Sequence, residues 1–236
     1  MIAIWKREMQ SYFLTPVGYV FTGVFLALSG LMFYVQNISA LNGNVLLMLS
    51  QITFLWMLLS PVLTMRLLAE ERHQKTDQLL LTSPVSLWGV VTGKFFAAAA
   101  VLGLTVLLTL GYVAVFAIYG KVFLGELMVG YMGFFLQGCS FLALDLYISG
   151  CAKNQVTAAI FAFGVNLALW VLELLGNALT LPIVSSVLNF MSLYGRYEPF
   201  LLGQLSYASV LFYFSFCAVF LFLTVRLLDA RRWREG

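Results

Sequence analysis

Residues 95–119 read FFAAAAVLGLTVLLTLGYVAVFAIY and contain no charged side chain. A membrane-spanning helix needs about 20 predominantly apolar residues, so this run is long enough to cross a bilayer. The rest of the chain has the same character, because 62% of its 236 residues are hydrophobic and 10% are charged. Soluble domains carry about 25% charged residues, and disordered chains combine high charge with low hydrophobicity. The composition therefore excludes both classes and predicts an all-α membrane protein without a separate catalytic domain.

Five more apolar runs flank residues 95–119 and bring the prediction to six transmembrane helices. Each run is within the usual length of a bilayer crossing, about 17 to 25 residues. The other predicted spans are residues 17–35, 45–63, 127–148, 156–172 and 207–228. Together the six spans form one transmembrane domain that covers residues 1–236.

Residues 1–15 have a different pattern, in which apolar and polar side chains lie on opposite faces of a helix. Ile2 and Trp5 belong to the apolar stripe, whereas Lys6 and Glu8 belong to the polar face. A basic amphipathic helix that carries a tryptophan lies in the plane of the membrane interface. We therefore predict an interfacial helix before the first span.

Residues 176–204 are apolar, but Pro182, Gly195, Pro199 and Gly203 interrupt them. Such a segment is too broken for a full crossing, because proline and glycine leave backbone groups that lipid cannot satisfy. A re-entrant or surface-lying hairpin on the outer side of the membrane fits this segment better. A complete additional span is the alternative.

The basic residues are distributed unevenly over the two sides of the predicted membrane domain. With six spans, both termini lie on one side together with eleven of the thirteen lysines and arginines, and only Lys121 and Arg196 lie on the other. Because basic residues concentrate on the cytoplasmic side, we predict that both termini are cytoplasmic. The net charge of +3 is too small and too dispersed to indicate nucleic-acid binding.

The chain lacks the residue combinations that membrane-embedded enzymes need. Its one histidine, His73, lies in the charged stretch 65–94, so a Ser–His or Cys–His pair cannot form at membrane depth. The predicted spans contain neither paired carboxylates nor a metal-ligand spacing. We predict that this chain is not an enzyme and that it binds no metal and no cofactor.

The predicted spans contain four carboxylate or carboxamide side chains, Gln51, Gln137, Asp145 and Asn166, and Glu173 closes the fifth span. An ionisable group within a membrane is by default a functional candidate. Both carboxylates, however, are predicted to lie within about one turn of an interface, where burial of a charge costs less. Two interpretations stay open for these side chains, hydrogen bonding between helices and lining of a transport pathway.

The stretch between the second and third spans, residues 65–94, is the richest in charged side chains. Its first part reads MRLLAEERHQKTDQLLLTSP (residues 65–84), in which charged helix formers precede three leucines. A charged helix beside exposed leucines is typical of a segment that docks into a groove on a soluble partner. The alternative is a solvated loop whose leucines lie on the membrane surface.

Three parts of the sequence resemble the permease subunits of type-2 ABC exporters (ABC-2 type). The first part is PVLTMRLLAEE (61–71) with TDQLLLTSPVS (76–86) and GKF (93–95). The second is WKRE, YF and TPVGYV within residues 5–20, and the third is LFLTVR and ARRW within residues 221–233. Within that group the chain is most similar to the permeases associated with gliding motility.

The resemblance implies a function for each segment. Residues 1–15 would form an elbow helix at the membrane interface, residues 65–94 a cytoplasmic coupling loop, and residues 176–204 extracytoplasmic re-entrant helices. A coupling helix continuous with the second span would contact a separate ATPase. The residues of that contact would be Glu70, Glu71, Arg72, His73, Lys75, Thr76, Asp77, Gln78, Leu79, Leu80 and Leu81.

The resemblance also implies the composition of the complex. ATP and magnesium would be bound by the ATPase rather than by this chain. Two ATPase copies would pair with two permeases, which are two copies of this chain or this chain and a related permease. An accessory membrane or extracytoplasmic protein and a location in the cell membrane of a bacterium are implied as well.

We therefore predict a transmembrane permease subunit of an ATP-driven transporter, which forms the translocation path as a dimer. Two functions of other classes stay open. A membrane anchoring or assembly subunit would recruit an ABC-type complex without classical transport. An ATP-independent channel or carrier would need two repeated halves, and no clear repeat relates residues 17–119 to residues 127–228.

Overall fold

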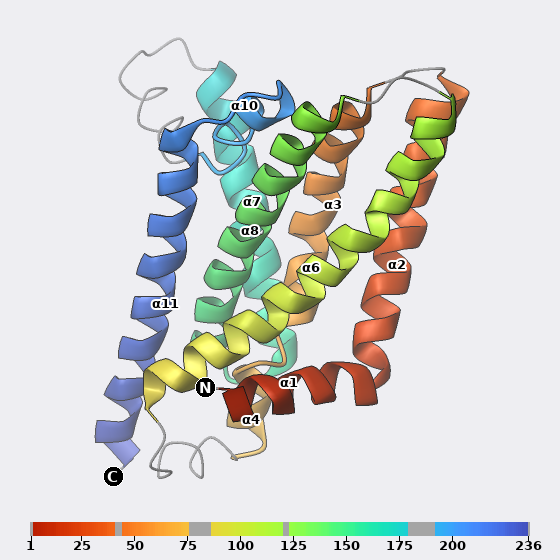
Figure 1. Ribbon diagram of the computed structural model, residues 1–236. Coiled ribbons are helices and arrows are strands. Elements are labelled where there is room, and N and C mark those ends of the chain that lie inside the picture. The colour runs from red at the N-terminus through yellow and green to blue at the C-terminus, as the bar shows by residue number, and fades with distance from the viewer. Residues whose placement is uncertain (1, 41–43, 76–85, 120–122, 179–191, 236) are drawn as a thin grey trace.

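The computed structural model describes residues 2–40, 44–75, 86–119, 123–178 and 192–235. These residues form helices joined by short turns, and they contain no strand (Figure 1). The helices are α1 (Ile2–Leu14), α2 (Pro16–Phe33), α3 (Val45–Thr64), α4 (Ala69–His73), α6 (Leu87–Tyr119), α7 (Leu124–Cys151), α8 (Gln155–Ala178), α10 (Glu198–Leu201) and α11 (Tyr207–Glu235). A π-helical turn, η1 (Tyr34–Ser39), extends α2.

Among the described residues, six helices are long and apolar enough to cross a membrane, in agreement with the six predicted spans. They cover Pro16–Ser39, Val45–His73, Leu87–Ile118, Leu124–Cys151, Gln155–Leu175 and Tyr207–Arg232. Most of the predicted bounds agree with these helices to within a few residues.

The start of the third span differs from its predicted position, as does the end of the second, which reaches His73 rather than residue 63. The helix α6 begins at Leu87 rather than at residue 95. Ser86 supplies the cap, because its hydroxyl accepts a hydrogen bond from the Gly89 N–H at 3.2 Å. The added turns bring Lys94 inside the helix.

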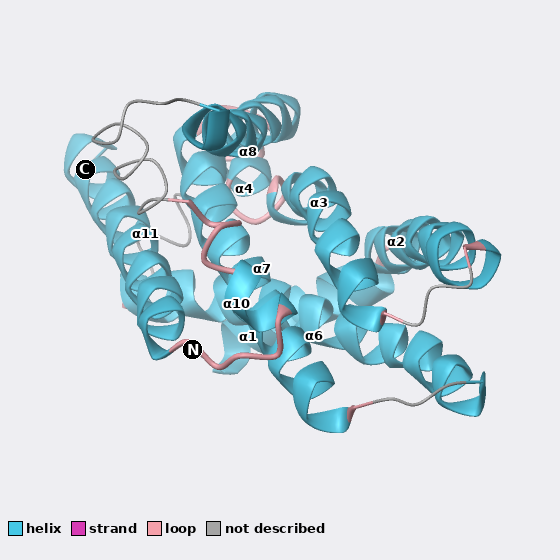
Figure 2. Cartoon of the chain, turned by 90° about the horizontal axis from the view of Figure 1, so that it is seen from above, coloured by secondary structure: helices cyan, strands magenta, loops and turns pink. Residues whose placement is uncertain are grey.

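The helix α7 lies at the centre of the molecule. It packs against α3, α6, α8, α10 and α11, whereas α2 lies at one edge (Figure 2). Glycines on α7 allow close approach: a Cβ added at Gly133 would lie 2.5 Å from the ring of Phe200, and one added at Gly138 would lie 2.8 Å from Leu102. Small residues at helix contacts are typical of packing in lipid, where hydrophobic burial does not drive helices together.

An aromatic cluster joins α2 and α7 to α3. Trp56 on α3 makes edge-on contacts with Phe21 and Phe25 of α2 and with Phe134 of α7, at ring-centre distances of 5.7, 5.8 and 6.4 Å. Edge-to-face pairs at such distances stabilise a fixed arrangement of rings. The first two spans are therefore anchored to the central helix.

The helix α1 runs across the lower ends of the spans instead of along them (Figure 1). The Tyr12 hydroxyl donates a hydrogen bond to the Leu63 carbonyl at 2.8 Å and ties α1 to the end of α3. Thr15 and Pro16 then begin α2. Burial raises the pKa of Tyr12, so its hydroxyl stays a donor.

The second span and the start of the predicted coupling helix lie in one helical stretch, Val45–His73, but a turn interrupts this stretch, so the predicted continuity holds only in part. Residues 65–68 form a turn between α3 and α4, in which the Leu67 N–H donates to the Thr64 carbonyl at 3.0 Å. The helix α4 itself ends at His73, and Lys75 has a φ of 56°, a conformation that cannot continue a helix. Residues 76–85 lie outside the described residues.

Candidate functional site

Four charged side chains from three elements meet where α1 crosses α4 and α6. We call them the charge cluster: Arg7 and Glu8 of α1, Glu71 of α4 and Lys94 of α6. The Lys94 ammonium lies 3.0 Å from Glu8 Oε1 and 2.9 Å from Glu71 Oε1, and this side chain is only 1% exposed. The Arg7 guanidinium lies 2.8 Å from Glu8 and 2.5 Å from Glu71. Two carboxylates and two cations thus form a neutral group that joins α1, α4 and α6.

The electrostatics of this cluster favour the charged forms of Glu8 and Arg7. Burial alone would raise the pKa of the Glu8 carboxyl, but Lys94 and Arg7 outweigh burial and hold that pKa below its ordinary value. The hydrogen bond to Glu8 in turn raises the pKa of Arg7. Removal of one partner from a buried ion pair costs about 3–5 kcal/mol, because a buried charge is left uncompensated. The contact between α1, α4 and α6 is therefore costly to break.

A second set of contacts ties α4 to the end of α7. The Ser149 hydroxyl accepts hydrogen bonds from the N–H groups of Leu68 and Ala69, at 3.4 and 3.2 Å. Arg72 donates to the carbonyls of Cys151 and Ala152, at 3.2 and 2.9 Å. A cation at the C-terminal end of a helix satisfies carbonyls that have no partner within the helix.

The turn before α4 is linked to the junction between α1 and α2. Arg66 donates to Glu70 at 3.0 Å and to the Thr15 hydroxyl at 3.2 Å. Together with the charge cluster and the contacts to α7, this link means that α4 touches the ends of several spans. A displacement of α4 would therefore reach α1, α6 and α7 at once.

The predicted coupling residues fall into three groups. Glu70, Glu71 and Arg72 form the bonds within the chain that are described above, whereas His73 and Lys75 are exposed. The remaining residues lie outside the described part of the chain: Thr76, Asp77, Gln78, Leu79, Leu80 and Leu81. Contact of this set with an ATPase stays a prediction.

Sequence reasoning missed Arg7, Glu8 and Lys94 as members of a site. The assignment of Glu8 to the polar face, opposite the apolar side chains of α1, is wrong, since this residue is 8% exposed and lies on the buried face of α1 with Ile4 and Tyr12. Ile4, Glu8 and Tyr12 follow one another at intervals of four residues, and this spacing is the signal that places them on one face of the helix. A lone lysine near the start of an apolar helix is the matching signal, because a buried ammonium requires a carboxylate partner.

A polar group without a cation lies among the spans. Asp145 on α7 is fully buried and accepts hydrogen bonds from Ser60 Oγ on α3 at 2.6 Å and from Asn166 Nδ2 on α8 at 3.0 Å. Asn166 also donates to the Met57 carbonyl at 3.3 Å. Because α7 continues to Cys151, Asp145 lies about two turns from the helix end, deeper than predicted. The structure shows hydrogen bonding between helices here, and lining of a pathway stays a prediction.

The other predicted polar residues lie elsewhere. Gln137 is buried and donates to the Leu193 carbonyl at 3.2 Å, and Glu173 hydrogen-bonds to the Ser192 side chain. These two residues hold the segment before α10 against α7 and α8. Gln51 is partly buried on α3. Of the predicted segment 176–204, residues 179–191 lie outside the described residues, so a re-entrant arrangement stays a prediction.

A family model described as "ABC-2 family transporter protein" matches residues 13–230. This match covers most of the chain: five of the six apolar helices lie within it, and it ends two residues before the end of the sixth, Arg232. No curated protein matches the chain.

Proposed function

Because the chain belongs to the ABC-2 family of transporter proteins, we propose that it is the permease subunit of an ATP-driven transporter and works with a separate ATPase. Members of this family are membrane components of transport systems and are not themselves catalytic. In our proposal the ATPase binds ATP and magnesium, and this chain binds no cofactor. Two permeases and two ATPases assemble, and the permease dimer forms the translocation path. The narrower similarity to gliding-motility permeases stays a prediction, as does an accessory subunit.

The proposed ATPase contact is the surface formed by α4 and the residues that follow it. The helix α4 lies at the same end of the molecule as α1 and both termini, while α10 lies at the opposite end (Figure 1). That end carries the basic residues that predict a cytoplasmic side. We therefore place both termini in the cytoplasm, α1 in the interface as an elbow helix, and α10 outside the cell membrane.

The charge cluster is the observation that supports coupling. ATP-driven movement of a soluble partner can act on the spans only through elements that contact both. Glu71 of α4 lies 2.9 Å from Lys94 of α6 and 2.5 Å from Arg7 of α1. A partner that moves α4 must therefore carry α1 and α6 with it or separate buried opposite charges.

Residues near α4 have two different proposed roles, contact with the ATPase and transmission of movement within the permease. Lys75 is exposed and free of the charge cluster, so its proposed role is contact with the ATPase. Lys94 is buried and 2.9 Å from Glu71, so its proposed role is transmission within the permease. Variants at the two positions should therefore fail in different assays.

Affinity purification in mild detergent tests the proposal. We expect the wild-type chain to co-purify with an ABC ATPase, and Lys75→Glu and Leu80→Asp to lower the yield of that ATPase at least about tenfold, as expected for central interface residues. Lys153→Glu is the matched control, because Lys153 is an exposed lysine on the turn between α7 and α8. Absence of any ATPase, or equal yields from all variants, contradicts the proposal. A chain that only anchors the ATPase would co-purify with it but leave its turnover unchanged.

A further inference from the structure

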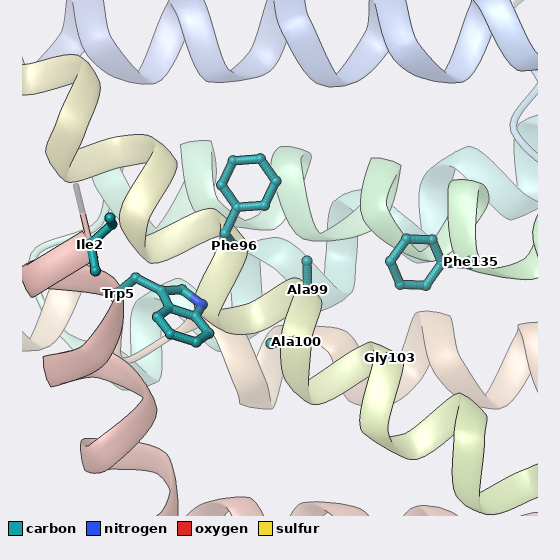
Figure 3. A pocket seen from close by; sticks show the side chains of 7 residues that line it. All are labelled: Ile2, Trp5, Phe96, Ala99, Ala100, Gly103 and Phe135. Atoms are coloured by element: carbon teal, nitrogen blue, oxygen red, sulfur yellow. The ribbon is translucent and has the colours of Figure 1, made fainter.

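An apolar groove with a volume of about 560 Å³ lies between α1, α6 and α7 (Figure 3). Ile2 and Trp5 of α1 form one end and Phe135 of α7 forms the other, while Phe96 and Gly103 of α6 lie between them. The rings of Trp5, Phe96 and Phe135 are 36 to 47% exposed, so the groove is open to its surroundings.

Small residues create the groove on the surface of α6. Ala99, Ala100 and Gly103 line its floor, and the large rings of Phe96 and Phe135 stand beside them. From Phe96 to Gly103 the helix rises about 10 Å, which is roughly one third of the hydrocarbon core of a bilayer. The groove thus begins at α1 and extends into the depth at which lipid acyl chains lie.

A lysine lies next to the α1 residues that line the groove. Lys6 is exposed and follows Ile2 by four residues, so the two side chains are neighbours where the apolar stripe of α1 meets its polar face. Trp5 contributes an amphipathic ring of the kind that prefers the membrane interface. Arg7 is different, because it pairs with Glu8 and Glu71. A cation at the mouth of an apolar groove complements a phosphate group that is attached to a hydrocarbon chain.

We propose that this groove binds one acyl chain of an anionic phospholipid, with the phosphate headgroup beside Lys6. The proposal rests on the proposed function only in placing α1 at the membrane interface. A protein occupant fits less well, because each side of a stable protein interface contributes about 20–30 residues and seven residues line this groove. A lipid wedged between α1 and α6 would stiffen the contact that the charge cluster also holds.

Photolabelling of the full-length protein tests this proposal. The protein is reconstituted in phosphatidylcholine vesicles that contain phosphatidylglycerol with a diazirine on its acyl chain, and mass spectrometry locates the label after irradiation. We expect labelled peptides from residues 96–103. Gly103→Leu fills the groove, and an added Cβ there meets only Phe135, at the ordinary contact distance of 3.7 Å. Because the added leucine side chain displaces a few methylene groups of the lipid from the groove, labelling of this segment should fall about tenfold.

Gly111→Leu is the matched control on the same helix, because an added Cβ at Gly111 meets nothing within 4 Å. It should leave the labelling unchanged, and thermal unfolding should show that both variants fold. Equal labelling of Gly103→Leu and the wild type overturns the proposal.

Lys6→Gln tests the headgroup part of the proposal. A diazirine-bearing phosphatidylcholine serves as the comparison probe, and the wild type should label more strongly with phosphatidylglycerol. In the variant, the ratio of phosphatidylglycerol labelling to phosphatidylcholine labelling should fall about fivefold, as expected for the loss of one lysine at a membrane surface. Equal labelling of the wild type by both lipids overturns an anionic ligand. Because the assay contains no ATPase, its failure leaves the proposed function standing, and a failed co-purification leaves this inference standing.

Discussion

We expect Lys94→Met to loosen the contact between α1, α4 and α6 without altering the membrane insertion of the chain. The substitution keeps an unbranched apolar stem and removes only the ammonium group, which lies 3.0 Å from Glu8 and 2.9 Å from Glu71. The two carboxylates would then share Arg7 alone. Breaking a fully buried pair costs about 3–5 kcal/mol. Because Arg7 remains and is itself 56% exposed, we expect a smaller loss of about 2–3 kcal/mol.

Thermal unfolding of the purified protein, followed by tryptophan fluorescence, measures this loss. A loss of this size lowers the midpoint of a chain of this length by about 5–10 °C. Lys153→Met is the control, since Lys153 is exposed and lies outside the charge cluster. In the complex with the ATPase, Lys94→Met should retain the ATPase on purification but lose most of the ATP turnover that depends on this subunit.

The double variant Lys94→Met with Glu8→Gln separates a charge effect from a packing effect. Once Glu8 is neutral, one of the two carboxylates that Lys94 compensated is gone and Arg7 can compensate Glu71, so we expect the double variant to regain about 1 kcal/mol or more over Lys94→Met. Such a gain measures the coupling between the two side chains. The reasoning fails if Lys94→Met is as stable as Lys153→Met, or if Glu8→Gln adds a further loss.

Three further predictions concern the hydrogen-bonded carboxyl, the pH dependence and the closest helix contact. Asp145→Asn should change the free energy of unfolding by less than about 1 kcal/mol, whereas Asp145→Leu, which leaves buried donors of α3 and α8 unpaired, should cost about 2–4 kcal/mol in thermal unfolding. Since the pKa of Glu8 is lowered in the folded protein, ionised Glu8 stabilises the fold above the ordinary carboxyl pKa of about 4.3. This stabilisation disappears as the pH falls through the lower pKa of the folded state. Hydrogen exchange of α1, corrected for the intrinsic rate, should therefore be equally slow at pH 7 and pH 5. Gly133→Val places atoms against Phe200, where even a Cβ would lie at 2.5 Å, and should cost about 1–3 kcal/mol, while Gly111→Val on an open face should change stability far less.

Hydropathy alone predicts the six spans because each span lies in its own apolar run and lipid leaves a helix as the simplest way to satisfy its backbone. The same reasoning misplaces the start of α6, because it treats Lys94 as the end of a loop. A lysine does not stop a helix, and its ammonium can be buried when carboxylates face it. The sequence pattern shows that Lys94 is a lone charge, but it does not show which carboxylates compensate it.

The partners that define both polar groups are distant in sequence, and this is why they could not be predicted. Glu8 and Lys94 are 86 residues apart, and Ser60 and Asp145 are 85 residues apart. Helical periodicity relates residues three or four positions apart, so it can place Glu8 on a face but cannot name what lies opposite. Asp145 and Asn166 were both candidates from the sequence, and their contact at 3.0 Å follows only from the packing of α7 on α8.

A neutral cluster of buried charges does not need to raise the stability of the fold, because apolar side chains of similar volume often give the same or a higher stability. Its advantage is that opposite charges fix one relative position of the elements that carry them. The contacts of α4 with α7 run through Ser149, whose neutral hydrogen bonds are individually worth about 1 kcal/mol, and through Arg72, whose bonds to backbone carbonyls are charge-assisted but meet no opposite charge. In the contact of Glu71 with the buried Lys94 both partners are charged and little exposed, so that contact is stronger, and the half-exposed Arg7 adds to it. When a partner displaces α4, the weaker contacts to α7 should yield first, and α1 and α6 should move with α4 as one unit relative to the central helix.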